Sequence, residues 1–192
     1  EWNLIEHLEL ADFKGLKKIE SLNINNNRII SIEAGFFKRL YLKNINASNI
    51  ELESWRHLDL DEFSTNVQKI DLSFNNFNSI NLNNIVYKMS SLSLRRTNIT
   101  LIQNLKTSFI SNLNSLDLSE NSIQDLEMFK WSELKNLTSL SFTNSNITNL
   151  DSFLQLSDNN MIRFLNLSFN SINSIGKAIT RFNQLRTLDL SN

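Results

Sequence analysis

Apolar and polar residues alternate along this chain in a short pattern that returns many times. In residues 70–72 and 116–118 the alternation has a period of two, which predicts a short strand with one buried face. A further apolar residue stands three positions before each strand, and a polar residue followed by another apolar one comes after it. The unit reads L-x-x-L-x-L-x-x-N-x-L, where L is any aliphatic or aromatic residue.

Eight copies of this unit follow one another through the chain. They start near residues 19, 42, 67, 89, 113, 137, 162 and 185, a spacing of about 22–25 residues. Such a repeat predicts an α/β solenoid with one parallel concave sheet of about eight short strands and a convex side of mostly irregular or 3₁₀ segments. Each buried aliphatic side chain stabilises the stack by about 1.5–3 kcal/mol. We interpret residues 1–192 as a single domain, truncated at both ends because the repeats start and stop incomplete.

The polar residue that follows each strand occupies what we call the ladder position. An amide there can bond to backbone groups of adjacent turns, and each such group buried without a partner costs about 1–3 kcal/mol. A hydroxyl can satisfy fewer groups, and Ile50 can satisfy none, so we expect a local irregularity in the second repeat. The predicted polar ladder comprises Asn27, Asn75, Thr97, Asn121, Ser145 and Asn170.

Aromatic residues recur on the return segment of each repeat. Their spacing predicts a spine of stacked rings beneath the convex surface, formed by Phe37, Phe63, Phe109, Trp131, Phe153 and Phe182. A packed spine explains the 13 Phe better than a cofactor site does.

The segment from Leu113 to Leu137, LNSLDLSENSIQDLEMFKWSELKNL, resembles the typical class of leucine-rich repeat found in Toll-like receptor and chaoptin-like ectodomains. This resemblance implies a leucine-rich repeat horseshoe that binds an extracellular ligand or partner, in innate immunity or adhesion. Two features depart from that class. The chain has no proline in its convex turns. It also has no Cys for disulfide-linked caps, and we attribute the missing caps to truncation.

Two columns of outward side chains are candidates for binding. The first, the strand-end column, carries acids on alternate strands, about 10 Å apart and too distant to share one metal ion. Its members are Asn23, Asn46, Asp71, Ser93, Asp117, Ser141, Asn166 and Asp189. We therefore expect no metal site and no cofactor.

The second, the outer column, comprises Asn26, Asn49, Phe74, Arg96, Glu120, Asn144 and Phe169. An aromatic residue beside arginines is the composition of a protein interface. The alternative is that Arg96 and Glu120 only pair with each other across strands, a contact worth less than about 1 kcal/mol. The predicted partner-binding residues are Phe74, Arg95, Arg96, Asp117, Glu120, Arg163 and Phe169.

Glycosylation sequons occur at Asn46, Asn98, Asn136, Asn146 and Asn166. Their number is no higher than an Asn-rich composition gives by chance, so their position matters more than their count. We expect a glycan at Asn46 or Asn166 to obstruct part of the concave face.

Composition argues against other classes of function. The formal net charge is −1, so no strong field indicates nucleic acid or an anionic membrane, and no apolar run is long enough to span a bilayer. With Cys 0 and only His7 and His57 as histidines, thiol chemistry is excluded and nothing in the sequence brings a nucleophile and a base together. We expect no enzymatic activity.

The sequence thus favours an extracellular protein, or the ectodomain of a membrane receptor, that recognises a macromolecule through its concave or lateral face. A dimer is one possible assembly. The alternative is a cytoplasmic leucine-rich repeat scaffold for protein–protein interaction, which the absence of Cys and of any sequon excess favours.

Overall fold

The structure is a computed structural model of the 192-residue chain. The structure describes residues 3–52, 66–77, 79–81, 89–103, 112–123, 126, 131–158 and 160–192.

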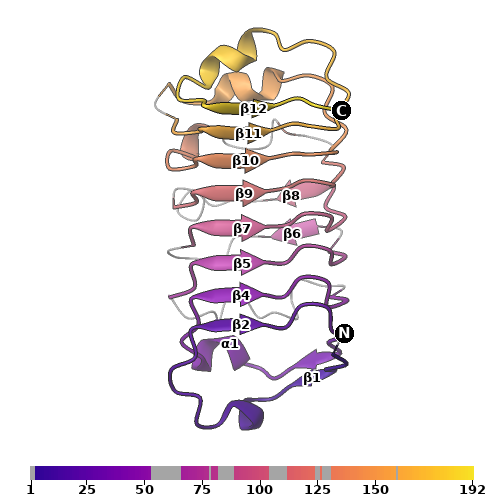
Figure 1. The fold of residues 1–192 in the computed structure, drawn as a ribbon, viewed down its shortest axis with the longest axis vertical. Helices are drawn as coiled ribbons and strands as arrows, with labels where there is room; N and C mark the ends of the chain where they lie inside the picture. The colour runs from indigo at the N-terminus through magenta and orange to yellow at the C-terminus, as the bar shows by residue number, and fades with distance from the viewer. Residues whose placement is uncertain are drawn as a thin grey trace.

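Eight short parallel strands form one continuous sheet that runs the length of the molecule (Figure 1). Their order in the sheet, β12-β11-β10-β9-β7-β5-β4-β2, follows the order of the repeats in the chain. The strands are β2 (Ser21–Asn23), β4 (Asn44–Asn46), β5 (Lys69–Asp71), β7 (Ser91–Ser93), β9 (Ser115–Asp117), β10 (Ser139–Ser141), β11 (Phe164–Asn166) and β12 (Thr187–Asp189). The predicted parallel sheet and repeat register are confirmed.

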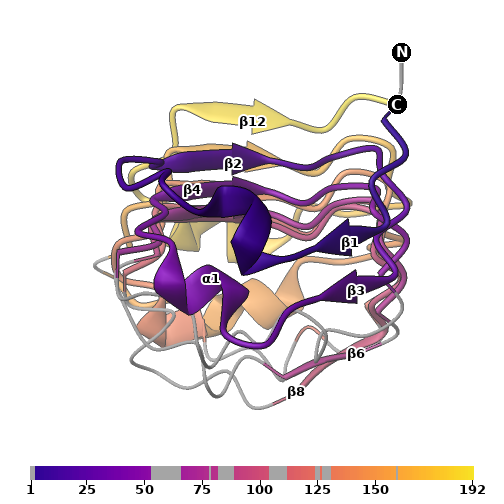
Figure 2. The same ribbon diagram turned by 90° about the horizontal axis from the view of Figure 1, so that it is seen from below.

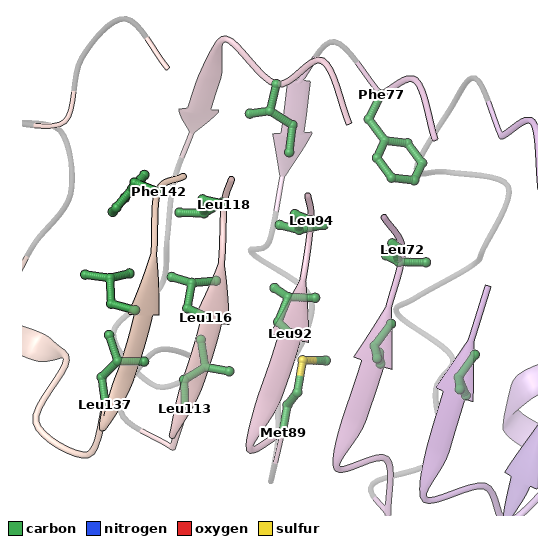
Figure 3. Close-up of a cluster of buried hydrophobic side chains, with 14 of the residues drawn as sticks. Leu72, Phe77, Met89, Leu92, Leu94, Leu113, Leu116, Leu118, Leu137 and Phe142 are labelled. Carbon is green, nitrogen blue, oxygen red and sulfur yellow. The ribbon is translucent and has the colours of Figure 1, made fainter. Parts of the chain in front are cut away.

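Equivalent residues of successive repeats lie directly beside one another. Ile70 pairs with Leu92, and Leu92 with Leu116, so that every central strand residue stacks on its counterpart. Rows of apolar side chains result, and Figure 3 shows them running across successive strands. Leu72, Leu94 and Leu118 form one of these rows and are almost fully buried. The core is therefore a continuous column and not a set of separate clusters.

Where they are described, the return segments contain short helical turns and extended pieces. The helical turns are η1 (Leu10–Phe13), α1 (Phe36–Arg39), η5 (Trp131–Glu133), η6 (Asp151–Gln155) and η7 (Lys177–Arg181). Two small parallel sheets accompany them, one pairing β1 (His7–Leu8) with β3 (Ser31–Ile32) and one pairing β6 (Ser79–Asn81) with β8 (Leu101–Gln103). β6 and β8 lie on the side opposite the main sheet (Figure 2). The expected irregular and 3₁₀ convex side is confirmed, whereas these paired extended pieces were not predicted.

Aromatic rings stack beneath the return segments near the C-terminal end. The ring centroids of Trp131 and Phe153 are 4.7 Å apart, and those of Phe153 and Phe182 are 5.3 Å apart. Near the other end, the rings of Phe36 and Phe37 meet edge to face at 5.2 Å. The predicted spine is confirmed for Trp131, Phe153 and Phe182, whereas Phe37 meets a ring of its own repeat, and Phe63 and Phe109 lie outside the described residues.

The chain leaves each main-sheet strand from β2 to β11 through a residue in the left-handed conformation. All members of the outer column have positive φ, from 50° at Arg96 and Asn144 to 61° at Phe74. Each of these residues donates its N–H to the next repeat, as Phe74 does to the carbonyl of Arg95 at 2.8 Å and Arg96 to that of Ser119 at 2.9 Å. The backbone bonding of the sheet therefore continues into the turn.

Four turns, which we call the Asn turns, carry Asn at the ladder position: Asn27, Asn75, Asn121 and Asn170. The buried Asn121 accepts N–H bonds from Thr97 and Ile99 of the preceding turn at 3.0 and 3.1 Å. Its amide donates to the carbonyls of Leu94 at 2.7 Å and Leu118 at 2.9 Å. Asn75 and Asn170 repeat this arrangement, so one side chain ties together two successive turns.

The turns in between, which we call the non-Asn turns, have Ile50, Thr97 and Ser145 at the ladder position and reach the neighbouring repeat with the backbone instead. The N–H of Phe77 donates to the carbonyl of Thr97 at 2.9 Å, and the N–H of Ile29 to that of Ile50 at 3.2 Å. The next residue in each non-Asn turn also takes positive φ: Glu51 59°, Asn98 58° and Asn146 57°. No Asn turn has this second left-handed residue.

The irregularity expected at Ile50 is therefore wrong. β4 keeps its register with β2 and β5. The N–H of Ile50 bonds to the Asn75 side chain of the next turn, and its carbonyl accepts from the preceding turn. A side chain without polar atoms is tolerated because the backbone and the neighbouring Asn meet the bonding requirement.

Candidate functional site

Four residues of the outer column have side chains that are unfavourable in the left-handed backbone conformation of that column. A left-handed residue other than Gly costs roughly 1–2 kcal/mol, and Asn tolerates this conformation better than bulky side chains do. Asn fills the position at Asn26, Asn49 and Asn144, whereas the three consecutive repeats between them carry Phe74, Arg96 and Glu120. Phe169 is the fourth departure. Strained residues of this kind gather at functional sites, and three adjacent ones mark this part of the turn edge.

Phe74, Arg95, Arg96 and Glu120 meet to form what we call the turn cluster. The guanidinium carbons of Arg95 and Arg96 each lie 5.9 Å from the centre of the Phe74 ring, within the range of a cation–π contact. Arg95 donates from Nε to Glu120 Oε1 at 2.8 Å and forms an ion pair with the same oxygen through Nη2. The cluster thus joins three repeats into one array of ring, two cations and carboxylate.

Arg96 is the least engaged member of the turn cluster. Its Nη1 lies 3.9 Å from Glu120 Oε2, beyond hydrogen-bond distance, and its side chain is 68 % exposed. The Glu120 side chain is only 19 % exposed because Arg95 covers it, and Phe74 is 45 % exposed. The array therefore presents a ring and a guanidinium fork to the solvent, while its carboxylate is largely used internally.

A groove of about 730 Å³ adjoins the turn cluster. It is lined by Asn49, Glu51, Phe74, Asn75, Asn76, Arg96, Asn98 and Glu120. These residues come from the outer column, the ladder position and the residue after it, so the groove follows the turn edge of the sheet. Glu51 is neutralised by Arg28, whose Nε lies 3.2 Å from its carboxylate. The volume lies within the range of pockets that hold ligands or side chains of a partner.

The other residues predicted to bind a partner do not join this cluster. Asp117 accepts the N–H of Ser119 at 2.9 Å and does not line the groove. Arg163 precedes β11, at the opposite end of the strands from the turn edge. Phe169 is 60 % exposed on the outer column, two repeats beyond Glu120. The turn cluster is thus smaller than the predicted set.

The strand-end column has a structural use that the sequence did not reveal. Its Asn and Asp side chains accept the N–H two residues later, as Asp71 does from Ser73 at 2.9 Å and Asn166 from Ser168 at 3.0 Å. Bonds from the hydroxyl and backbone N–H of Ser191 lower the pKa of the Asp189 carboxyl. Among the described residues, no group of three or more His, Cys, Asp or Glu is arranged to hold a metal ion.

One histidine meets a possible nucleophile after all. Nδ1 of His7 lies 2.8 Å from Oγ of Ser31, across the pairing of β1 with β3. Register pairing brings these two residues together although they lie 24 positions apart in the chain. The pair is exposed, and a hydrogen bond between strands accounts for it. His57 lies outside the described residues.

The sequons differ in their surroundings. Asn98, Asn136 and Asn146 are exposed, whereas Asn46 and Asn166 are half-buried and use their Oδ1 atoms to accept bonds from Ser48 and Ser168. Asn98 lines the groove and donates to Asn76 Oδ1 at 3.2 Å. A glycan has more room at the three exposed positions.

Comparison with known proteins supports the fold. No known protein family matches the sequence, and no curated protein does. The crystal structure of the leucine-rich repeat domain of APL1B is similar, with a TM-score of 0.67 and 18 % identity. The match covers 98 % of this chain and 59 % of that one, so the chain spans about three-fifths of the solved domain. This likeness is one of fold: the chain is a leucine-rich repeat solenoid.

Proposed function

We propose that this leucine-rich repeat chain is the recognition part of an extracellular receptor or secreted protein, and that it binds a partner protein at the turn cluster. The fold suits protein–protein recognition because stacked repeats offer a long continuous surface. No helix among the described residues is long and apolar enough to span a membrane. Participation in innate immunity or adhesion belongs to the same proposal.

The observation that carries the proposal is the exposed Phe74 held between two arginines. Interfaces are enriched in aromatic residues and Arg, and a few such residues supply most of the binding energy. Stability alone does not explain the cluster, because Phe74, Arg96 and Glu120 occupy left-handed positions where Asn fits with less strain. The Arg95–Glu120 ion pair contributes on the order of 1 kcal/mol, which is less than the summed strain of three left-handed residues.

An extracellular location is supported by the three exposed sequons. Asn98 and Asn146 follow the ladder position in two non-Asn turns and lie on the same edge of the solenoid, while Asn136 precedes β10. A glycan at Asn98 would stand in the groove beside the turn cluster. The proposal therefore requires that Asn98 carry no glycan in the molecules that bind.

Site-specific photo-crosslinking tests the proposal. A photoreactive amino acid replaces Phe74 in one variant and the exposed Lys135 of the return segment in another. Each variant is mixed with secreted and cytosolic fractions of the source cells. We expect a discrete partner from the secreted fraction, crosslinked from position 74 and not from 135. Crosslinking from the cytosolic fraction alone would instead favour the intracellular scaffold.

The partner so identified allows the site to be measured. Replacing Phe74 and Arg96 by Ala together should weaken binding by about 2 kcal/mol or more, with thermal stability nearly unchanged. Arg96→Glu should be worse, because it places like charge beside Glu120. Lys135→Ala is the control. A partner that binds the double variant and the parent equally well would refute the proposed site.

A further inference from the structure

We infer that the turn cluster receives a carboxylate side chain of the partner protein, bound by the guanidinium of Arg96, with an apolar neighbour packed against Phe74. This inference rests on the proposed function and adds the chemistry of the partner. It follows from how the three arginines and two glutamates around the groove are shared.

Two of the three arginines already have a carboxylate. Arg28 lies 3.2 Å from Glu51, and Arg95 holds Glu120 through both Nε and Nη2. Arg96 is left with the far oxygen of Glu120 at 3.9 Å. The five charged side chains in and beside the groove therefore sum to one net positive charge, and Arg96 is the arginine with the longest contact to a carboxylate.

Phe74 holds this charge in a defined place. The cation–π contact at 5.9 Å positions the Arg96 guanidinium next to the ring, and the planar fork matches a carboxylate in two-point contact. A second carboxylate can approach from the solvent side, since Glu120 is covered by Arg95. The half-exposed Phe74 ring then offers an apolar surface directly beside the ion pair.

The position of the turn cluster in the repeat favours binding of a ligand over the alternative that its arginines only pair with Glu120. Arg95 stands in a column otherwise filled by small polar residues, namely Asn25, Ser48, Ser73, Ser119, Thr143, Ser168 and Ser191. Covering Glu120 would need only one arginine. The second arginine is in a strained left-handed conformation and mostly exposed, and among the described residues its side chain has only the long contact with Glu120 and the cation–π contact with Phe74.

The experiment uses two tripeptide probes with blocked ends, acetyl-Leu-Glu-Leu-amide and acetyl-Leu-Gln-Leu-amide, titrated into the isotope-labelled chain. Binding is followed by NMR at the Arg Nε–Hε and Phe74 ring signals. We expect shifts at Arg96 and Phe74 and an affinity about tenfold higher for the Glu probe, because bonds to a charged acceptor are stronger than neutral ones. Raising the salt concentration should reduce that difference.

Matched variants locate the effect. Arg96→Gln should reduce Glu-probe binding about tenfold to the level of the Gln probe, and Arg96→Lys should retain part of it, since the charge remains without the fork. Lys135→Gln removes an exposed cation of the return segment, outside the groove, and should leave binding unchanged. Circular dichroism and melting temperature verify that each variant is folded.

The outcomes separate this inference from the proposed function. Equal affinity for the two probes, or no signal change at Arg96 with either, overturns the carboxylate inference. The turn cluster remains the proposed interface as long as position 74 crosslinks the partner. Failure of that crosslinking overturns the proposed function, whatever the probes do.

Discussion

The Asn turns and the non-Asn turns guide the chain through the same bend with different atoms. In an Asn turn the side chain of Asn121 binds two N–H groups and two carbonyls belonging to two successive repeats. In a non-Asn turn the carbonyl of Thr97 accepts one N–H from the preceding repeat, and the left-handed Asn98 follows it. The comparison teaches that a repeat position can lose its defining side chain when the backbone supplies an equivalent acceptor.

The largest expected effect is at an Asn turn. Asn121→Ala should lower the free energy of unfolding by about 3 kcal/mol, because several buried backbone groups in two repeats lose their partner at once. Urea denaturation measures the change through the transition midpoint. A loss below about 1 kcal/mol would show that water or backbone shifts replace the amide.

Removing the hydroxyl of a non-Asn turn should cost less. Thr97→Ala deletes the bond from Oγ1 to the carbonyl of Leu94 at 2.7 Å but leaves the backbone bond from Phe77 in place. We expect a loss of about 1 kcal/mol in the same denaturation assay. Thr97→Val, which keeps the shape, serves as the control for packing. A larger loss than that of Asn121→Ala would reverse the ranking of the two turn types.

Replacing the second left-handed residue of a non-Asn turn by Gly should stabilise the protein, whereas the two preceding substitutions destabilise it. Glu51→Gly should raise the melting temperature, with a gain of about 0.5–1 kcal/mol, since Gly adopts this conformation without strain. Ser171→Gly, at the matching position of an Asn turn and without positive φ, should be destabilising by a similar amount. If both variants shift the melting temperature in the same direction, backbone strain does not distinguish the turns.

The smallest effect is expected where one turn type is converted toward the other. Thr97→Asn offers a new amide, but the N–H of Phe77 already bonds to the carbonyl of Thr97. We expect a change within about 0.5 kcal/mol in urea denaturation, as for substitutions that gain no new buried bond. A stabilisation above about 1 kcal/mol would show that the carbonyl is an incomplete substitute.

The sheet and its register could be predicted from the sequence because they depend on side-chain periodicity. Leu92 and Leu116 recur at fixed offsets, and stacking identical repeats leaves little freedom in how they pair. The paired extended pieces β6 and β8 could not be predicted, since each has only three residues, too few to show an alternation of apolar and polar positions. Ile50 was misjudged because its missing side-chain bonds were counted without the backbone of its neighbours.

The turn cluster was predicted in part for the same reason. Adjacent repeats put Phe74, Arg96 and Glu120 in one column, so their proximity follows from register alone. The left-handed backbone beneath them was missed, although Asn26, Asn49 and Asn144 in the same column were its signal. Asp117 lies outside the turn cluster, and the bond of its carboxylate to the N–H two residues later could not be predicted from the sequence.

Because Asn turns and non-Asn turns alternate, the repeats of the solenoid are grouped in pairs, each joined by the side chain of one ladder Asn. Amide side chains link Ile50 to Asn75, Thr97 to Asn121 and Ser145 to Asn170, while the seams between pairs rely on backbone bonds. Hydrogen exchange should therefore be slower at Thr97 and Ile99, which bond to Asn121, than at Phe77, whose amide crosses a seam. Phe74 and Arg96 face each other across that seam. A partner that contacts both Phe74 and Arg96 would hold the two repeats together at this seam. Its binding should therefore slow hydrogen exchange at the buried amide of Phe77.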